Sequence, residues 1–185
     1  QVHSTRRTGW SVANGQIDLA IIGGQLPSDL ENLLQVIPYA TDELALVLPT
    51  KHPLANKKEL LKEDLYKLNF VTLDTQSTTR KVVDKLLQDS GLDIQRLKIE
   101  MELNSLEAIK NAVQSGLGAS FLPVVSIERE LAAGTIHKAF VADLEVKREL
   151  KLITNPSRYT SRASEVFKKN ILPQFASLES PLRQV

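Results

Sequence analysis

The chain has 185 residues, enough for one domain or two small ones with buried cores. Its 23 basic and 22 acidic residues nearly balance, which argues against a domain that grips nucleic acid by itself. Cysteine is absent, which excludes disulfides, thiol catalysis and cysteine zinc sites, and no apolar run is long enough to span a membrane.

The first predicted unit is a helix followed by a buried strand. The helix includes Trp10–Ala13 and stops at Gly15, and the strand Ile17–Ile22 ends at two glycines. The polar segment Thr5–Thr8 precedes this helix, and it is either a solvated basic turn, the more frequent case, or part of a binding site. The chain opens within a strand-like segment, Gln1–His3, and lacks an initial Met, so we expect it to be a piece of a longer protein.

The middle of the chain predicts further strands and helices. Leu33–Tyr39 is predicted to be extended, Asp42–Pro49 and Asn69–Leu73 are predicted strands, and a short helix is expected around Leu60 to Leu65. The helix that follows Thr79 is expected to stop at Gly91. It places four apolar residues on one face: Val82, Val83, Leu86 and Leu87.

The most regular pattern is Asn104–Pro123, which predicts a capped helix, a glycine stop and a buried strand. Asn104 is the expected cap, with Glu107 reaching back to it. Gly116 and Gly118 are expected where positive φ and close backbone approach are needed. The strand before this unit carries alternating apolar residues, which predicts burial on one side only: Ile99, Met101 and Leu103.

The C-terminal part predicts a helix over Val124–Ala133 ended by Gly134, and a strand over Leu150–Ile153. A last helix is expected to start near Thr160 or Ser161 and to end by Pro173, with Ala163, Val166, Phe167 and Ile171 facing inward. Because strands alternate with helices, we expect a parallel-rich α/β architecture. Without a low-complexity linker, we expect two lobes joined by strands that cross near Pro49 and Leu150, with a ligand cleft between the lobes.

The loop Asp74–Thr79 joins a strand to a helix start and is rich in hydroxyl groups. Its hydroxyls, with the helix dipole, suit a carboxylate or phosphate, but Ser77 or Thr78 could equally be a simple cap. Arg80 in the first turn opposes the helix dipole, so it is either a surface residue or the partner of a bound anion.

Asn104-Ser105 is a further polar helix start, again either a cap or a ligand contact. Each polar start follows a strand, where α/β folds place their ligands. The chain shows no enzyme signature: the histidines are scattered, and Ser115 does not lie in a nucleophile elbow. Asp18 is either a catalytic acid or, more commonly, a partner of nearby backbone.

The segments Gly15–Ile21 and Glu107–Pro123, with the turns His52–Leu54 and Asn155–Tyr159, resemble the effector-binding domain of LysR-type transcriptional regulators. The resemblance covers nearly the whole chain. Within that family, Thr5–Pro27 is similar to the RuBisCO-operon and CO2-responsive regulators of cyanobacteria and plastids.

The resemblance implies two Rossmann-like subdomains like those of type 2 periplasmic binding proteins, joined by crossover strands. Residues 1–48 would begin subdomain I, 49–149 would form subdomain II, and 150–185 would cross and return to subdomain I. It also implies a first strand and helix of subdomain I, and an N-terminal winged helix-turn-helix, upstream of this chain. Promoter DNA would be bound through that missing part, and the domain would form a homodimer or homotetramer.

The implied ligand is a small anionic carbon metabolite, of the class of 2-oxoglutarate, 2-phosphoglycolate or ribulose bisphosphate, with no cofactor and no metal. The expected ligand-binding residues are the polar helix starts: Thr5, Ser77, Thr78, Thr79, Arg80, Asn104 and Ser105. We therefore expect a regulator of carbon-assimilation genes in the cytoplasm or plastid stroma, not an enzyme. The main alternative is a transporter's solute-binding protein with the same two lobes, and an enzyme of this fold is the third choice.

Overall fold

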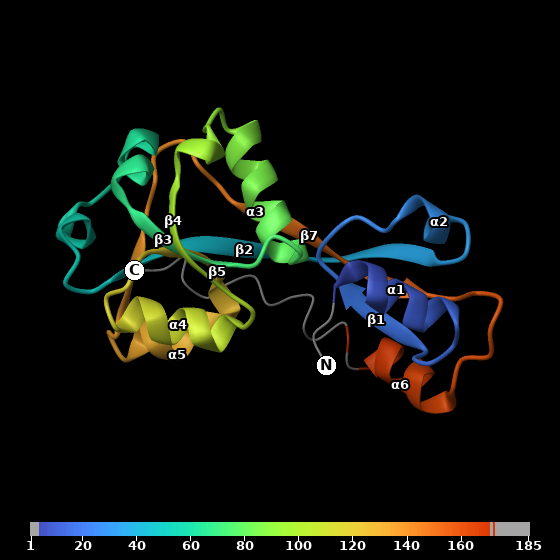
Figure 1. Cartoon of the computed structure of the whole chain (residues 1–185). Coiled ribbons are helices and arrows are strands. Elements are labelled where there is room, and N and C mark those ends of the chain that lie inside the picture. Colours follow the sequence, from blue (N-terminus) through green and yellow to red (C-terminus); the bar gives the residue numbers. More distant parts are fainter. Residues whose placement is uncertain (1–3, 171, 173–185) are drawn as a thin grey trace. The chain divides into compact units, whose positions relative to one another are not determined.

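The computed structural model describes residues 4–170 and Leu172. The chain divides into two compact units, and each is considered by itself (Figure 1). Unit one consists of residues 1–42 and 148–185, and unit two of residues 43–147. The divisions fall a few residues before the predicted ones at 48/49 and 149/150. The first lies inside the uninterrupted strand β2 (Gln35–Pro49), where no turn residue marks it.

Unit one contains α1 (Thr5–Ala13), β1 (Leu19–Ile22), α2 (Ser28–Glu31), the first part of β2, most of β7 (Lys147–Thr154) and α6 (Arg162–Asn170). β1 pairs antiparallel with β7, with Leu19 opposite Thr154. Its core lies around Val12, Leu30 and Ile153. The predicted helix and strand of this unit are confirmed.

The start of α1 differs from the prediction, because Thr5–Thr8 lie inside the helix and not in a turn before it. Ser4 is the cap, and its Oγ accepts a hydrogen bond from the Arg7 backbone N–H at 3.4 Å. A cap at Ser4 makes Thr5 the first helical residue, and its side chain is buried. The predicted strand over residues 1–3 lies outside the described residues.

The last helix also differs from the prediction, since Ala163, Val166 and Phe167 are exposed. Ile171 and Pro173 lie outside the described residues. α6 is attached at its start instead: Asp18 Oδ2 accepts hydrogen bonds from Ser161 N (3.1 Å), Ser161 Oγ (2.5 Å) and Ser164 Oγ (2.6 Å). These hydrogen bonds, from Ser161 first, lower the pKa of Asp18. Asp18 therefore anchors a helix start far along the chain.

Unit two is built on the rest of β2 and on the strands β3 (Asn69–Leu73), β4 (Lys98–Leu103), β5 (Ser120–Pro123) and β6 (Ile136–Ala139). Its helices are α3 (Thr78–Asp89), α4 (Leu106–Gln114) and α5 (Val124–Ala132). Three short 3-10 helices complete it: η1 (Pro53–Asn56), η2 (Lys62–Lys67) and η3 (Ile94–Arg96). One core packs under α3 and another under α4 and α5, and Figure 1 shows these helices on opposite sides of the strands.

The apolar face predicted for α3 is confirmed: Val83 and Leu87 are buried, and Val82 and Leu86 pack against the same core. The glycine stop after α4 is confirmed as well. Gly116 has φ +85°, and a Cβ on Gly118 would lie 2.6 Å from the backbone oxygen of Asn69. Helix α5 ends before Gly134, as predicted.

The strand pairing is more mixed than the predicted parallel-rich sheet. β3 and β4 pair in parallel, but β2 pairs antiparallel with both β5 and β6. The order of helices and strands cannot reveal this, because β2 crosses between the units instead of returning through a helix. The short strand β6 was not predicted.

β4 is the outer strand of its ladder, and the prediction that one of its faces is buried is wrong. Ile99 is 36% exposed and Met101 is 39% exposed. Only Leu103, at the carboxyl end of the strand, is half-buried. An alternating pattern shows which side chains share a face, but not whether another layer covers that face.

Asp64 is buried in unit two, and its contacts indicate that the stability of this unit is sensitive to acid. Its carboxylate accepts hydrogen bonds from Lys67 Nζ (2.7 Å), Leu61 N (3.1 Å) and Lys57 Nζ (3.1 Å), and these hold its pKa well below the usual 3.8. A depressed pKa means that the stabilisation is present above about pH 4 and is lost as the pH falls through the folded-state pKa.

We expect Asp64→Asn to lower the unfolding free energy at pH 7 by about 2 kcal/mol, since it weakens hydrogen bonds to charged donors. The variant should also lose less stability than the parent between pH 4 and pH 2, as measured by urea unfolding. Asp89→Asn, which removes only an exposed ion pair with Lys85, is the control and should behave like the parent. Equal acid sensitivity in Asp64→Asn and the parent would contradict the prediction.

Candidate functional site

The candidate site lies where the two parallel strands of unit two end. Leu73, the last residue of β3, is paired with Leu103, the last residue of β4. The Asp74 backbone N–H donates to the Leu103 oxygen at 3.1 Å, so the pairing continues just past β3. The turns that follow lead directly into α3 and α4. Two of the polar helix starts predicted from the sequence therefore lie at the same strand edge.

The α3 start is a compact turn. Asp74 Oδ1 accepts from Gln76 N at 2.8 Å, and Ser77 N donates to the Asp74 oxygen at 3.0 Å. Ser77 is the cap, and its Oγ accepts from Arg80 N at 3.4 Å. Thr78 and Thr79 are the first two helical residues, and both are half-buried and engaged in contacts. Ser77 thus caps the helix, as one of the sequence alternatives held.

The α4 start corrects one residue of the prediction, because the cap is Ser105 and not Asn104. Ser105 has extended backbone (φ −143°, ψ 140°), and its Oγ accepts from Ala108 N at 3.1 Å. Asn104 is exposed beside it. Glu107 does not reach back to the cap; its Oε1 pairs with Lys110 Nζ at 2.7 Å.

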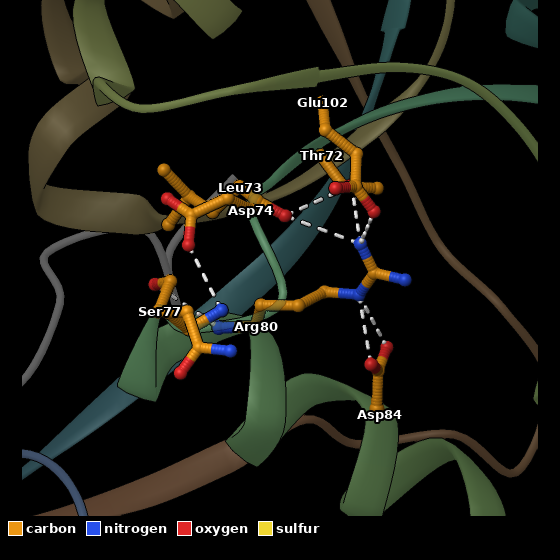
Figure 2. Close-up of polar contacts among 8 residues, drawn as sticks. Thr72, Leu73, Asp74, Ser77, Arg80, Asp84 and Glu102 are labelled. Carbon is orange, nitrogen blue, oxygen red and sulfur yellow. Dashed lines mark hydrogen bonds and ion pairs between the residues drawn. The ribbon is translucent and has the colours of Figure 1, made fainter.

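Arg80, in the first turn of α3, has a hydrogen-bond network of its own that reaches β3 and β4 (Figure 2). Its Nε donates to Asp84 Oδ1 at 2.9 Å and to Oδ2 at 2.8 Å. Its Nη1 donates to Thr72 Oγ1, to the Leu73 oxygen at 3.1 Å and to Glu102 Oε1 at 3.4 Å. Arg80 was expected either on the surface or against a bound anion; its side chain is instead only 13% exposed and is held by carboxylates of the protein itself.

A small cavity lies under α3, next to Arg80 and Thr79 and lined mainly by apolar side chains such as Val83 and Phe121. Its volume of about 30 Å³ holds roughly two water molecules and no metabolite. It does not include Ser77, Thr78, Asn104 or Ser105. A ligand of these four residues would therefore lie outside this cavity.

Thr5 belongs to unit one, where its side chain is buried at the start of α1. Unit one also has a cavity of about 360 Å³ beside Asp18 and Arg158, which sequence reasoning did not find. Arg158 Nε donates to the Ala13 oxygen at 2.9 Å at the end of α1. In the sequence, the signal for this place was a glycine, Gly15, at the end of the first helix. In the structure its φ is +72°, and a Cβ there would lie 2.8 Å from Arg158 Nη1.

Neither a metal site nor a membrane helix is found among the described residues. No group of three or more histidine, aspartate or glutamate side chains within 4–170 and Leu172 could hold a metal ion. In the same part of the chain, no helix has the length and apolar character needed to cross a bilayer.

Comparison with known families agrees with this two-unit α/β fold. The family model described as the LysR substrate binding domain matches residues 1–176. The chain therefore belongs to the LysR substrate-binding-domain family.

Curated relatives extend this assignment. A protein of Synechocystis sp. named "Probable RuBisCO transcriptional regulator" is 59% identical over 177 residues, which cover 96% of this chain and 51% of the relative. A protein of the same name from Porphyra purpurea is 58% identical over 177 residues, 96% of this chain and 56% of the relative. The chain thus spans about half the length of these relatives. Their names agree with the prediction of a regulatory chain and favour neither an enzyme nor a transporter component.

Solved structures show the same fold. The regulatory domain of Synechocystis CcmR, solved in complex with 2-PG, has a TM-score of 0.80 and 23% identity, covering 96% of this chain and 82% of that one. The effector-binding domain of QuiR, in complex with shikimate, has a TM-score of 0.76 and 21% identity, covering 96% and 80%. The predicted α/β fold of the type 2 periplasmic-binding-protein kind, with two subdomains, is confirmed.

Proposed function

We propose that this chain is the effector-binding domain of a LysR-type regulator that senses a small anionic carbon metabolite and controls carbon-assimilation genes. The observation that carries the proposal is the shared strand edge, where α3 and α4 both begin with hydroxyl-bearing caps, Ser77 and Ser105. Helix N-termini carry partial positive charge and favour anions. Hydroxyl groups add donors that can adapt to carboxylate or phosphate oxygens.

We propose that the ligand contacts come from Ser77, Thr78 and Thr79 at one start and from Asn104 and Ser105 at the other. Thr5 lies in unit one with its side chain buried, so it is not part of this strand edge. The relatives' names support a metabolite of carbon fixation, and the CcmR complex with 2-PG supports the phosphorylated-acid class. No cofactor is required for binding of this kind.

In the complete protein, we propose that promoter DNA is contacted by a part that this chain does not contain. The balanced charge of the chain and the greater length of its relatives support that division. We further propose a homodimer or homotetramer in the cytoplasm or the plastid stroma. A bound metabolite would act through its different affinity for two arrangements of the domain.

The test removes hydroxyl groups at the strand edge. We expect Thr78→Ala to weaken binding of 2-phosphoglycolate or 2-oxoglutarate several-fold, because one lost hydrogen bond costs about 0.5–1.5 kcal/mol. Ser105→Asn, which keeps the ability to cap the helix, should also weaken binding. Titration calorimetry on the complete protein measures both affinities.

Ser90→Ala is the matched control, because it removes a hydroxyl at the opposite end of α3 that bonds the Leu86 oxygen at 2.8 Å. Its affinity should equal that of the parent. If the double substitution Ser77→Ala, Thr78→Ala binds the metabolite as tightly as the parent protein, the strand edge is not the sensor site.

A further inference from the structure

Arg80 joins elements that are far apart in the sequence. Its Nε donates a hydrogen bond to Asp84 one turn further along α3, while its Nη1 donates to Thr72 and to the Leu73 oxygen at the end of β3. Glu102 Oε1, at 3.4 Å, adds a contact to β4. One guanidinium therefore touches α3 and both strands whose ends form the candidate site (Figure 2).

The chemistry of this contact set is specific to arginine. A guanidinium is planar, always charged, and presents several N–H donors in a rigid fork, so it can bond in several directions at once. A lysine ammonium in its place would act as a single charge on a flexible stem. The side chain is also 13% exposed and Asp84 24% exposed, so solvent screens this ion pair less than one on the open surface.

The position of Arg80 in the helix needs such partners. A cation in the first turn faces the positive end of the helix dipole, which is unfavourable by a few tenths of a kcal/mol to about 1 kcal/mol. The carboxylates of Asp84 and Glu102 offset that cost. Lys85 and Asp89 form a second ion pair at the same spacing on α3, but their side chains are 69% and 56% exposed.

Resting on the proposed function, we infer that Arg80 is a positioning residue that fixes the α3 start relative to the ends of β3 and β4. The hydroxyl groups of both helix starts then hold one arrangement toward the anion. Leu73 lies four residues before Ser77, and Glu102 two residues before Asn104. A shift of the guanidinium would thus affect the starts of both helices. Affinity would follow from this order, because an ordered site has less conformational entropy to lose on binding.

A direct contact between Arg80 and the anion makes the opposite prediction. Its third nitrogen, Nη2, has no acceptor among the described residues, so it is the donor that such a contact would use. If such a contact dominated, removing the negative charge of Asp84 would strengthen the pull on the ligand and tighten binding. If positioning dominates, the same change loosens the fork and weakens binding.

The experiment therefore measures the sign of the effect of Asp84→Asn, which keeps the shape of the side chain. In the complete protein, we expect affinity for 2-phosphoglycolate to fall about 3- to 10-fold, within the roughly 2- to 30-fold range of mutations that act on a site without touching its ligand. The affinity of Arg80→Lys should fall by a similar factor, although this variant keeps the positive charge. Asp89→Asn, the matched control on the same helix, should bind like the parent.

Amide hydrogen exchange without ligand supplies the second measurement. We expect Asp84→Asn to speed exchange at the starts of both α3 and α4, and Asp89→Asn to leave the α4 start unchanged. Equal or tighter binding by Asp84→Asn, or exchange unchanged at the α4 start, would overturn the inference. Failure of the parent protein to bind any of the anions, with the exchange effect present, would instead overturn the proposed function alone.

Discussion

Lys110→Met is expected to lower the unfolding free energy by about 3 kcal/mol, the low end of the range for removing one partner of a buried ion pair. Lys110 is 7% exposed on α4, and its Nζ lies 2.7 Å from Glu107 Oε1 and 2.8 Å from Glu130 Oε1 on α5. It also donates to the Ser126 oxygen at 3.2 Å. Methionine preserves the length of the side chain but removes the ion-pair partner of Glu130. Glu130 Oε2 is already buried without a hydrogen-bond partner in the part of the chain described.

Denaturant unfolding measures the effect, and two variants separate charge from packing. Lys85→Met removes a lysine whose ion pair is exposed, and it should cost less than about 1 kcal/mol. Adding Glu130→Gln to Lys110→Met should recover part of the loss, because no unpaired charge then remains buried. If Lys110→Met and Lys85→Met cost the same, the ion pair between α4 and α5 does not stabilise the unit.

The same triad sets an alkaline limit. Hydrogen bonds from Lys110, first to Glu107 and then to Glu130, raise the pKa of Lys110 above its usual 10.5. For a raised pKa, the stabilisation is fully present below the unfolded-state value and disappears as the pH rises through the folded-state value. The triad therefore stabilises the protein at neutral pH, and its contribution declines above about pH 10.5. The pKa of Glu130 is lowered, first by its hydrogen bond from Lys110, so the protein also loses stability as the pH falls below the usual glutamate value of 4.5.

Local sequence signals predicted the elements that depend on local chemistry. Glycine at positive φ marks the ends of α4 and α5, and the helical spacing of Val83 and Leu87 gives the buried face of α3. At α4 the prediction missed by one residue, because Asn104 and Ser105 are both good capping residues and only the backbone conformation decides between them. At α1 the error was larger, because Thr5–Thr8 were predicted to precede the helix and instead lie inside it, with Ser4 as the cap.

Features that depend on distant partners were not predictable in this way. Asp84 lies four residues from Arg80, a spacing that suggests an ion pair, but nothing in the sequence brings Thr72 and Glu102 to the same guanidinium. Exposure of Ile99 and Met101 likewise depends on which layer covers β4. The sequence therefore located the polar helix starts of the candidate site, while the network that orders them is visible only in three dimensions.

Gly118→Ala is expected to be about as destabilising as Lys110→Met, costing about 3 kcal/mol, for a steric reason. A Cβ on Gly118 would lie 2.6 Å from the backbone oxygen of Asn69 and 3.2 Å from Val71 Cγ2. The Asn69 oxygen is backbone and cannot rotate away, and it already accepts the Ala119 N–H at 2.8 Å. Val71 N donates to the Ala119 oxygen at 2.8 Å, so moving β3 away would strain both hydrogen bonds that join it to the segment entering β5. Overpacking of a core costs 1–3 kcal/mol, and occasionally more.

Gly116→Ala is the matched control, two residues earlier in the same turn. Gly116 has φ +85°, but a Cβ there would meet no atom within 4 Å. Alanine at this position therefore pays only for its left-handed backbone conformation, about 1–2 kcal/mol, and Gly116→Asn should cost less because asparagine tolerates that conformation. Denaturant unfolding of the three variants gives the order of stability, with Gly118→Ala the least stable.

Since the strain falls on β3, whose last residues lead into the turn before α3, Gly118→Ala should also weaken metabolite binding, whereas Gly116→Asn should not. A Gly118→Ala protein as stable as Gly116→Ala would mean that β3 and the start of β5 can separate without cost, against the close backbone contact described for them.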